Sequence, residues 1–168
     1  MTTLEGYRIL AHLEHTGDKA CLERLTRPAP PGRFVPRVTI NRMADICARG
    51  GDPPDEQPDP EAGPCPILTD RHCSFYPVRP FGCRCMVSAR NCAETGFAEM
   101  DPFILTLNDI FLQHLEHIDA HGYTGNVVDV MQFFDGLLAN QPVFVLMIPP
   151  EHRNRIQPVL QQIRRIQV

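Results

Sequence analysis

An acidic, proline-rich stretch near the middle of the chain limits the fold more than any other sequence feature. From Gly50 to Pro66 the chain carries six prolines, five acidic residues and no basic residue. Proline lacks the amide hydrogen that helices and sheets need, and closely spaced like charges favour solvent over a core. We therefore expect residues 50–64 to form a linker that joins two helical parts, 1–49 and 101–168, of a single domain of 168 residues.

The spacing of apolar residues predicts a mostly α-helical protein. Asp101-Pro102 has the form of a helix start, with an N-cap acceptor followed by proline in the first turn, and Gly122 would end that helix. The clearest helical periodicity covers residues 126–140. Other predicted helices cover residues 4–25 with a candidate break at Gly17, residues 39–47, and residues 156–163 with Pro158 in the first turn or at a kink. Residues 143–148 could form one short strand or a buried extended segment.

Composition argues against several functional classes. Hydrophobic residues make up 43% of the chain and charged residues 21%, as in ordinary globular proteins. The formal net charge of -4 argues against general nucleic-acid binding, and no run of about 20 apolar residues predicts a membrane span. The first ten residues lack the apolar core of a signal peptide, so we expect a cytoplasmic protein.

The cysteines are clustered, because five of the seven lie between Cys65 and Cys92. Their odd number and low density do not indicate a disulfide framework. In a reducing cytoplasm, clustered thiols are more typical of metal ligands or catalytic groups. Pro77, Pro80 and Gly82 would interrupt any regular element in this segment. We expect residues 65–92 to form a long irregular loop that binds a metal through thiolates.

The charge of the same segment supports an anionic metal centre. Four arginines lie between Cys65 and Cys92 against one acidic residue, Asp70, although the whole chain is acidic. Four thiolates around Zn²⁺ carry a net charge of about −2, and such a centre is stabilised by donors that point at the sulfurs. We expect Arg79 and Arg84 to act as these donors. The plainer alternative is a solvated basic loop with free cysteines.

The segment also resembles a known family. Cys65-Pro-Ile-Leu is followed by Cys73 with the aromatic Tyr76 three residues on, and then by Arg79-Pro-Phe-Gly-Cys83-Arg. This pattern is similar to the YkgJ-type cysteine-cluster family, whose members are described as zinc- or iron-chelating proteins. The resemblance implies that Cys65, Cys73 and Cys83 are metal ligands and that Arg79 lies behind them.

The sequence departs from this family upstream of Cys65. The family usually carries a cluster of closely spaced cysteines there, whereas this chain has only single cysteines at positions 21 and 47. The fourth ligand must therefore come from Cys92, Cys85, Cys47 or His72. We favour Cys92 because its spacing from Cys83 matches the other gaps. Thiolates suit both zinc and a [4Fe-4S] cluster. We favour zinc because the upstream cysteines are missing.

Two interpretations of function follow. In the first, a zinc ion organises the loop of a small helical binding protein; in the second, the same cysteines hold an iron–sulfur cluster in a redox or protein-modification enzyme. No nucleotide-binding or nucleophile motif appears, so we name no catalytic residue. Histidines near positions 12–15 and 114–121 fit a solvated surface. Arginines at 153, 155, 164 and 165 fit a solvated helix face, with an acidic protein partner as the alternative.

Overall fold

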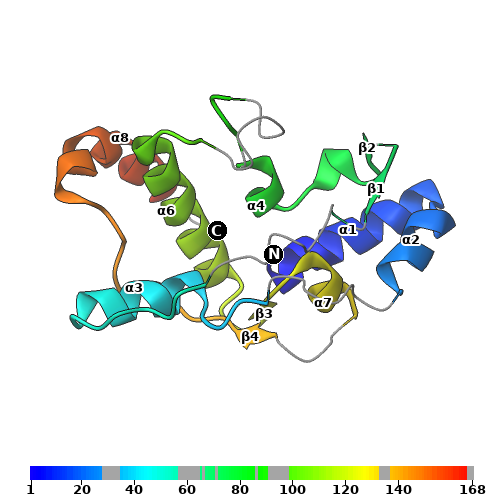
Figure 1. Cartoon of the computed structure of the whole chain (residues 1–168), viewed down its shortest axis with the longest axis horizontal. Coiled ribbons are helices and arrows are strands. Elements are labelled where there is room, and N and C mark those ends of the chain that lie inside the picture. The colour runs from blue at the N-terminus through cyan, green and yellow to red at the C-terminus, as the bar shows by residue number, and fades with distance from the viewer. Residues whose placement is uncertain are drawn as a thin grey trace.

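A computed structural model describes residues 1–27, 35–56, 65, 67–70, 72–85, 87–90, 99–132 and 137–165. These residues form a mostly α-helical domain, as the apolar spacing predicts, and two short two-stranded sheets, which it does not predict. Figure 1 shows α1 and α2 at one end of an elongated molecule and α3, α6 and α8 at the other. None of the helices in the described part of the chain combines the length and apolarity needed to cross a bilayer.

The first predicted helix is two helices that are separated at Gly17. Helix α1 covers Thr3–Thr16 and α2 covers Lys19–Leu25. Gly17 has φ 68°, a left-handed conformation that residues with a Cβ adopt at a cost, and this conformation ends α1. At the other end of α1, Thr2 and Glu5 form a capping box, in which each side chain accepts a hydrogen bond from the other residue's amide. The interruption expected at Gly17 is confirmed.

Helices α3 (Ile40–Ala48) and α6 (Pro102–Ile118) start where the sequence predicts. The side chains of Thr39 and Asp101 accept hydrogen bonds from amides of the first turns, and Pro102 occupies the first helical position. The two helices pack against each other. Their contact includes a buried hydrogen bond of 3.1 Å from Nε2 of Gln113 to Oδ1 of Asn41.

The C-terminal part packs on the outer face of α6. A 3-10 turn, η2 (Pro150–His152), leads into α8 (Arg153–Ile163). Ile156 and Leu160 of α8 form a small core with Ile110 of α6. Pro158 lies inside α8, beyond its first turn. Residues 143–148, all described, form neither helix nor strand.

The helix predicted over residues 126–140 is wrong in its last part. Helix α7 covers only Val127–Gln132, and Leu138–Ala139 form strand β4, which pairs antiparallel with β3 (Tyr123–Thr124). Asn140 explains the difference, because its amide donates to the Gly122 carbonyl and its side chain donates to the Asp119 carbonyl at the end of α6. These tertiary hydrogen bonds override the local apolar periodicity. Residues 133–136 lie outside the described residues.

The acidic stretch is described only as far as residue 56. Residues 51–56 have no regular structure. Oε1 of Glu56 accepts hydrogen bonds from the amides of Arg37 and Val38, at 2.5 and 3.1 Å, so this part of the expected linker returns to the entry of α3. Residues 57–64, the remainder of the expected linker, lie outside the described residues.

The cysteine segment contains more regular structure than the long irregular loop we expected. It includes a two-stranded hairpin, β1 (Leu68–Thr69) and β2 (His72–Cys73), a 3-10 turn η1 (Tyr76–Val78) and one helical turn α4 (Phe81–Arg84). These elements are short, and residues 79–80 break the run between η1 and α4, where Pro80 begins the next turn. Figure 1 shows this segment running along one side of the molecule from α1 and α2 toward α6. Its geometry is therefore set by what it packs on.

Candidate functional site

Two apolar side chains fix the cysteine segment to the N-terminal helices. Ile67 and Phe75 are 0% and 2% exposed and belong to one core cluster with residues of α1 and α2. Burial of side chains of this size contributes about 1.5–3 kcal/mol each. The cluster consists of Ile9, Leu13, Cys21, Leu25, Ile67 and Phe75. The segment is thus an integral part of the N-terminal core.

Two polar contacts complete this attachment. Oε1 of Glu5 in α1 accepts a hydrogen bond of 2.6 Å from the amide of Phe81, at the start of α4. Nη2 of Arg24 in α2 donates to Oγ of Ser74 at 2.6 Å. Glu5 also accepts from the Thr2 amide through its other oxygen, so one carboxylate bridges the first turn of α1 and the turn that carries Cys83.

The thiols of the segment are more exposed than a thiol that serves only as a small hydrophobe. Cys21 is fully buried in the core, whereas Cys65 and Cys83 are exposed and Cys73 is half-buried. Free cysteine is among the residue types most often buried, so an exposed set is unusual. In this segment the apolar residues Ile67 and Phe75 enter the core and the thiols stay at its edge.

Cys65 and Cys73 lie near enough to Cys83 to influence the pKa of its thiol. Burial raises the pKa of the Cys83 thiol, and the negative charge that Cys65 and Cys73 would carry raises it further. The amino group of Met1 opposes this rise in pKa, and the carboxylate of Glu5 adds to it. Cys65 precedes β1, Cys73 ends β2 and Cys83 lies in α4, so separate elements bring the three thiols together.

The donor chemistry of these thiols suits a metal, but their present positions do not form a closed site. Among the residues that the structure describes, no three His, Cys, Asp or Glu side chains are grouped so that they could hold a metal ion. Zinc takes four ligands with Zn–S distances of about 2.3 Å. Cys65 and Cys73 would therefore have to move toward Cys83 for all three to bind one ion.

The candidates for a fourth ligand differ in their surroundings. Sγ of Cys85 donates to the Gly82 carbonyl at 3.4 Å, and the pKa of this thiol is raised by burial and by the nearby carboxylates of Asp109 and Glu5. Cys85 therefore faces α6. Cys47 is exposed near the end of α3. Cys92 lies outside the described residues.

His72 neighbours one of the three thiols in the chain. It is exposed in β2 next to Cys73, and its Nδ1 is 2.8 Å from the Asp70 carbonyl oxygen. Successive residues of a strand point to opposite faces. His72 and Cys73 are thus poorly arranged to bind the same ion.

The two arginines expected behind the metal make different contacts. Arg84 donates to two carbonyls of its own segment, through Nε to Arg79 at 2.7 Å and through Nη2 to Pro77 at 2.9 Å. The guanidinium of Arg79 stacks on the Tyr76 ring, 3.6 Å from its centroid, while its Nε is buried with no hydrogen-bond partner in the described structure. The largest charge effects on Cys83 come from other groups than these arginines. Arg84 acts as a brace of the segment.

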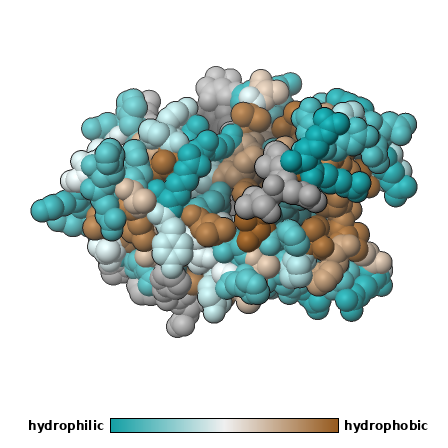
Figure 2. Space-filling model, turned by 180° about the vertical axis from the view of Figure 1, so that it is seen from behind, coloured by the Kyte–Doolittle hydropathy of each residue, from teal (hydrophilic) through white to brown (hydrophobic). Residues whose placement is uncertain are grey.

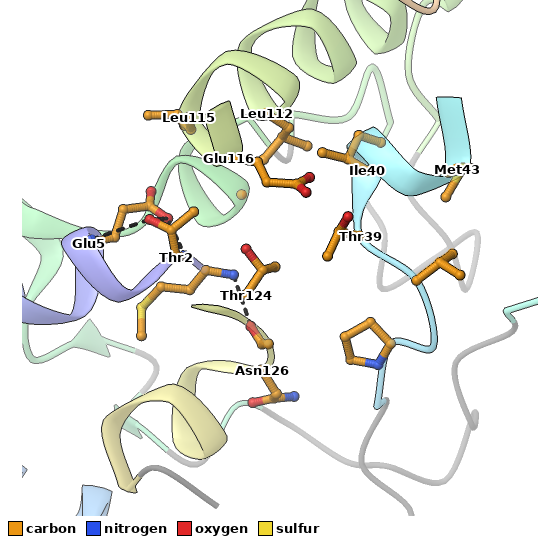
Figure 3. Close-up of a pocket in the computed structure, with 15 residues that line it drawn as sticks. Thr2, Glu5, Thr39, Ile40, Met43, Leu112, Leu115, Glu116, Thr124 and Asn126 are labelled. Atoms are coloured by element: carbon orange, nitrogen blue, oxygen red, sulfur yellow. Dashed lines mark hydrogen bonds between the residues drawn. The ribbon is translucent and has the colours of Figure 1, made fainter. Parts of the chain in front are cut away.

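Sequence reasoning did not identify a pocket next to this segment. Its volume is about 360 Å³, and it lies between α1, α3, α6 and β3, with Gly82 of α4 also in its wall. Figure 3 shows the side chains of Glu116, Thr39 and Thr124 around this space, with Leu112 and Leu115 of α6 above it. The Thr2-x-x-Glu5 pattern gives a local signal for the cap, but nothing local signals a pocket built from four distant elements.

Comparisons with known proteins identify no relative of this chain. No protein-family model matches it, and neither a curated protein nor a solved structure resembles it significantly.

Proposed function

We propose that this protein binds one metal centre through the thiolates of Cys65, Cys73 and Cys83. The observation that carries the proposal is that Cys65 and Cys73, on separate short elements, lie near enough to Cys83 to raise its pKa, while Cys65 and Cys83 are exposed and Cys73 packs only at the edge of the core. Burial and the neighbouring thiols raise the pKa of Cys83, so its thiol form is favoured in the absence of a cation, and a bound metal would replace the proton. The similarity of residues 65–84 to YkgJ-type cysteine clusters supports the same ligands.

Metal binding would close the segment. The hairpin that ends at Cys73 and the turn that carries Cys83 are each attached to the N-terminal core, through Phe75 and through Glu5 respectively. A metal that draws the thiols together would stabilise the fold of the segment, because ligands are rarely preformed without it and binding free energy then contributes to folding. In this proposal the metal has a structural role. Cys92 or Cys85 would supply the fourth thiolate.

Zinc is the first choice for this centre, and an iron–sulfur cluster is the alternative. The thiols of Cys65, Cys73 and Cys83 are exposed or half-buried. Zinc needs only four tetrahedral ligands and no sheltered environment. A cluster would be favoured by the aromatic side chains next to Cys83, where the rings of Phe81 and Phe111 are 5.6 Å apart. With zinc, the chain would be a metal-binding protein. With an iron–sulfur cluster, it could carry out redox or protein-modification chemistry.

Elemental analysis of the purified protein, made with and without oxygen, tests this proposal. We expect about one zinc ion per chain and a colourless protein; iron with a brown colour would identify the cluster instead. In competition with a chelator, Cys65→Ser, Cys73→Ser and Cys83→Ser should each lose the metal, because each removes one thiolate. Cys21→Ala is the matched control, since this cysteine is buried in the core. Metal retention equal to that of the control in all three variants would overturn the proposal.

The fourth ligand needs its own comparison. Cys85→Ser and Cys92→Ser are tested beside Cys47→Ser, which alters an exposed thiol on another helix. The variant that loses metal as completely as Cys83→Ser identifies the fourth ligand. If none of the three does, the centre has only three protein ligands, and a metal-bound water would complete it.

A further inference from the structure

The pocket between α1, α3, α6 and β3 has the size and chemistry of a ligand site. Its volume of about 360 Å³ corresponds to roughly a dozen water molecules at about 30 Å³ each. Pockets of about 300–1,000 Å³ are typical of sites for small molecules. Its wall is mainly apolar, with side chains from α3 and α6, and a few polar groups interrupt it. The apolar side chains belong to Met1, Pro36, Val38, Ile40, Met43, Leu112 and Leu115.

Glu116 gives the inner wall of the pocket a negative charge. This residue is 1% exposed, and its two carboxylate oxygens accept hydrogen bonds from the amides of Asn41 and Gln141, both at 2.8 Å. No basic side chain among the described residues forms an ion pair with it. The one cationic group in the wall is the amino group of Met1, which donates to the Gly125 carbonyl at 2.9 Å and has Glu5 as its charge partner. A buried carboxylate that is hydrogen-bonded but not neutralised still favours a cation nearby. Each oxygen retains a lone pair that a further donor can use.

The other polar groups of the pocket are consistent with a ligand that donates hydrogen bonds. The hydroxyl of Thr124 donates to Oδ1 of Asn140 at 2.6 Å, which leaves its oxygen as an acceptor. The hydroxyl oxygen of Thr39 accepts a hydrogen bond from the Arg42 amide and has a second lone pair for a further donor. Figure 3 shows Glu116, Thr39 and Thr124 on different sides of one space. The second carboxylate of the wall, Glu5, interacts with the amino group of Met1.

We propose that this pocket binds a small aliphatic primary amine in its ammonium form. The ammonium would lie at Glu116 and Thr124, because it brings three donors and a positive charge to a site with acceptors and a negative charge. Its hydrocarbon chain would lie along Leu112, Leu115 and Ile40. A carboxylate ligand would be repelled, because the carboxylates of Glu5 and Glu116 outnumber the amino group of Met1 in the wall. A neutral apolar ligand would leave the charge of Glu116 uncompensated. A metal ion is disfavoured, since the described residues offer no group of three ligands here.

Titration with matched probes, followed by amide NMR, tests the charge requirement. n-Butylamine is compared with n-butanol and with butyrate, which have similar chains and differ in the charge of the head group. We expect saturable shifts at the amides of Asn41 and Gln141 with butylamine, at a Kd of about 1 mM, and at least about tenfold weaker binding of the other two. Equal affinity for all three probes, or no shift at these amides with butylamine, would overturn the proposal.

Two substitutions on α6 test the location without touching the buried hydrogen bonds. Leu112→Phe enlarges a side chain in the wall of the pocket, while Leu105→Phe makes the same change at an exposed position of the same helix outside it. Leu112→Phe should weaken butylamine binding at least about tenfold, and Leu105→Phe should leave it unchanged. Equal affinity of the two folded variants would place the amine elsewhere and refute the site. Glu116→Gln, where it folds, should abolish the preference for butylamine over butanol.

This test is independent of the proposed metal centre. The amides of Asn41 and Gln141 report on α3 and on the segment after β4, and neither residue belongs to the cysteine segment. Titration of protein stripped of metal should give the same preference for the amine. Failure of amine binding would leave the metal proposal intact, and failure of metal binding would leave the pocket intact.

Discussion

The two ends of the molecule are held together by different means. At the end formed by α1, α2 and the cysteine segment, the contacts between elements are mainly apolar, and the thiols of Cys65 and Cys83 stay outside them. At the contact between α3 and α6, the buried groups are polar: Asn41, Gln113 and Glu116 bond one another and the backbone after β4. Apolar contacts tolerate small shifts, whereas buried hydrogen bonds require particular positions.

This difference predicts how much each candidate site would move when a ligand binds. The cysteine segment is attached to the N-terminal core and, through α4, to α6. Closure around a metal would therefore move the exposed Cys65 and Cys83 more than the buried anchors Ile67 and Phe75. The pocket beside α3 and α6 is instead preorganised, because the residues of its inner wall are fixed by hydrogen bonds on several sides.

On the rear face hydrophobic residues reach the surface near the middle, with hydrophilic residues toward both ends (Figure 2). Four sets of substitutions test the comparison.

Removal of the main apolar anchor should have the largest effect. Phe75→Ala leaves a cavity in the N-terminal core and should lower the free energy of unfolding by about 3–5 kcal/mol. Tyr76→Ala, at the exposed neighbouring position, should change it by less than about 1 kcal/mol apart from the lost contact with Arg79. Urea unfolding measures both. Similar effects of the two changes would mean that the segment is not part of the core.

Removal of the polar centre at the other end should cost somewhat less. Gln113→Ala leaves the Val145 carbonyl, the Met147 amide and the side-chain oxygen of Asn41 without their partner. With about 1–3 kcal/mol for each buried unsatisfied group, and some of these groups regaining water, we expect a loss of about 2–4 kcal/mol. Gln161→Ala on the exposed face of α8 is the control. An effect equal to the control would show that this end is held by apolar packing instead.

The two arginines should affect metal affinity rather than folding. Arg84→Ala removes the brace between α4 and the Pro77 and Arg79 carbonyls, so closure around a metal should become less favourable. We expect ~10–100-fold weaker zinc binding in a chelator competition for Arg84→Ala. Arg79→Ala should weaken binding by a similar factor if its free Nε turns to a sulfur when the metal binds. Arg79→Lys should then restore part of the charge effect only. Unchanged competition curves for both alanine variants would exclude a role at the centre.

The smallest effect concerns Asp109, which lies between the two regions on α6. Burial raises the pKa of this carboxyl above its usual value, so the folded state binds its proton more tightly than the unfolded state. Stability therefore falls as pH rises from below the ordinary pKa through the raised one. Asp109→Asn should make metal-free protein more stable at neutral pH and should have no effect below about pH 3. Asp52→Asn, at an exposed position, is the control. A variant less stable than wild type at pH 7 would contradict this prediction.

Local signals in the sequence predicted the helices well and the site only in part. Asp101-Pro102 starts a helix and Gly17 ends one through local capping and backbone preferences, so both ends could be predicted from the sequence alone. The end of α7 could not be predicted from the sequence, because it depends on hydrogen bonds that Asn140 makes with residues about 20 positions away. The cysteine cluster was visible as spacing. The pocket could not be predicted, because nothing in the sequence distinguishes Glu116 from a surface glutamate. Its burial depends on the distant residues Asn41 and Gln141, whose amides donate to its carboxylate.

One carboxylate makes the two candidate sites partners in a thermodynamic cycle. Glu5 lines the pocket, caps α1 through the Thr2 amide and bonds the Phe81 amide, two residues before Cys83. A metal that shifts α4 would move a wall of the pocket, and a molecule in the pocket would favour one position of α4. Linkage then requires each ligand to change the affinity of the other by the same factor.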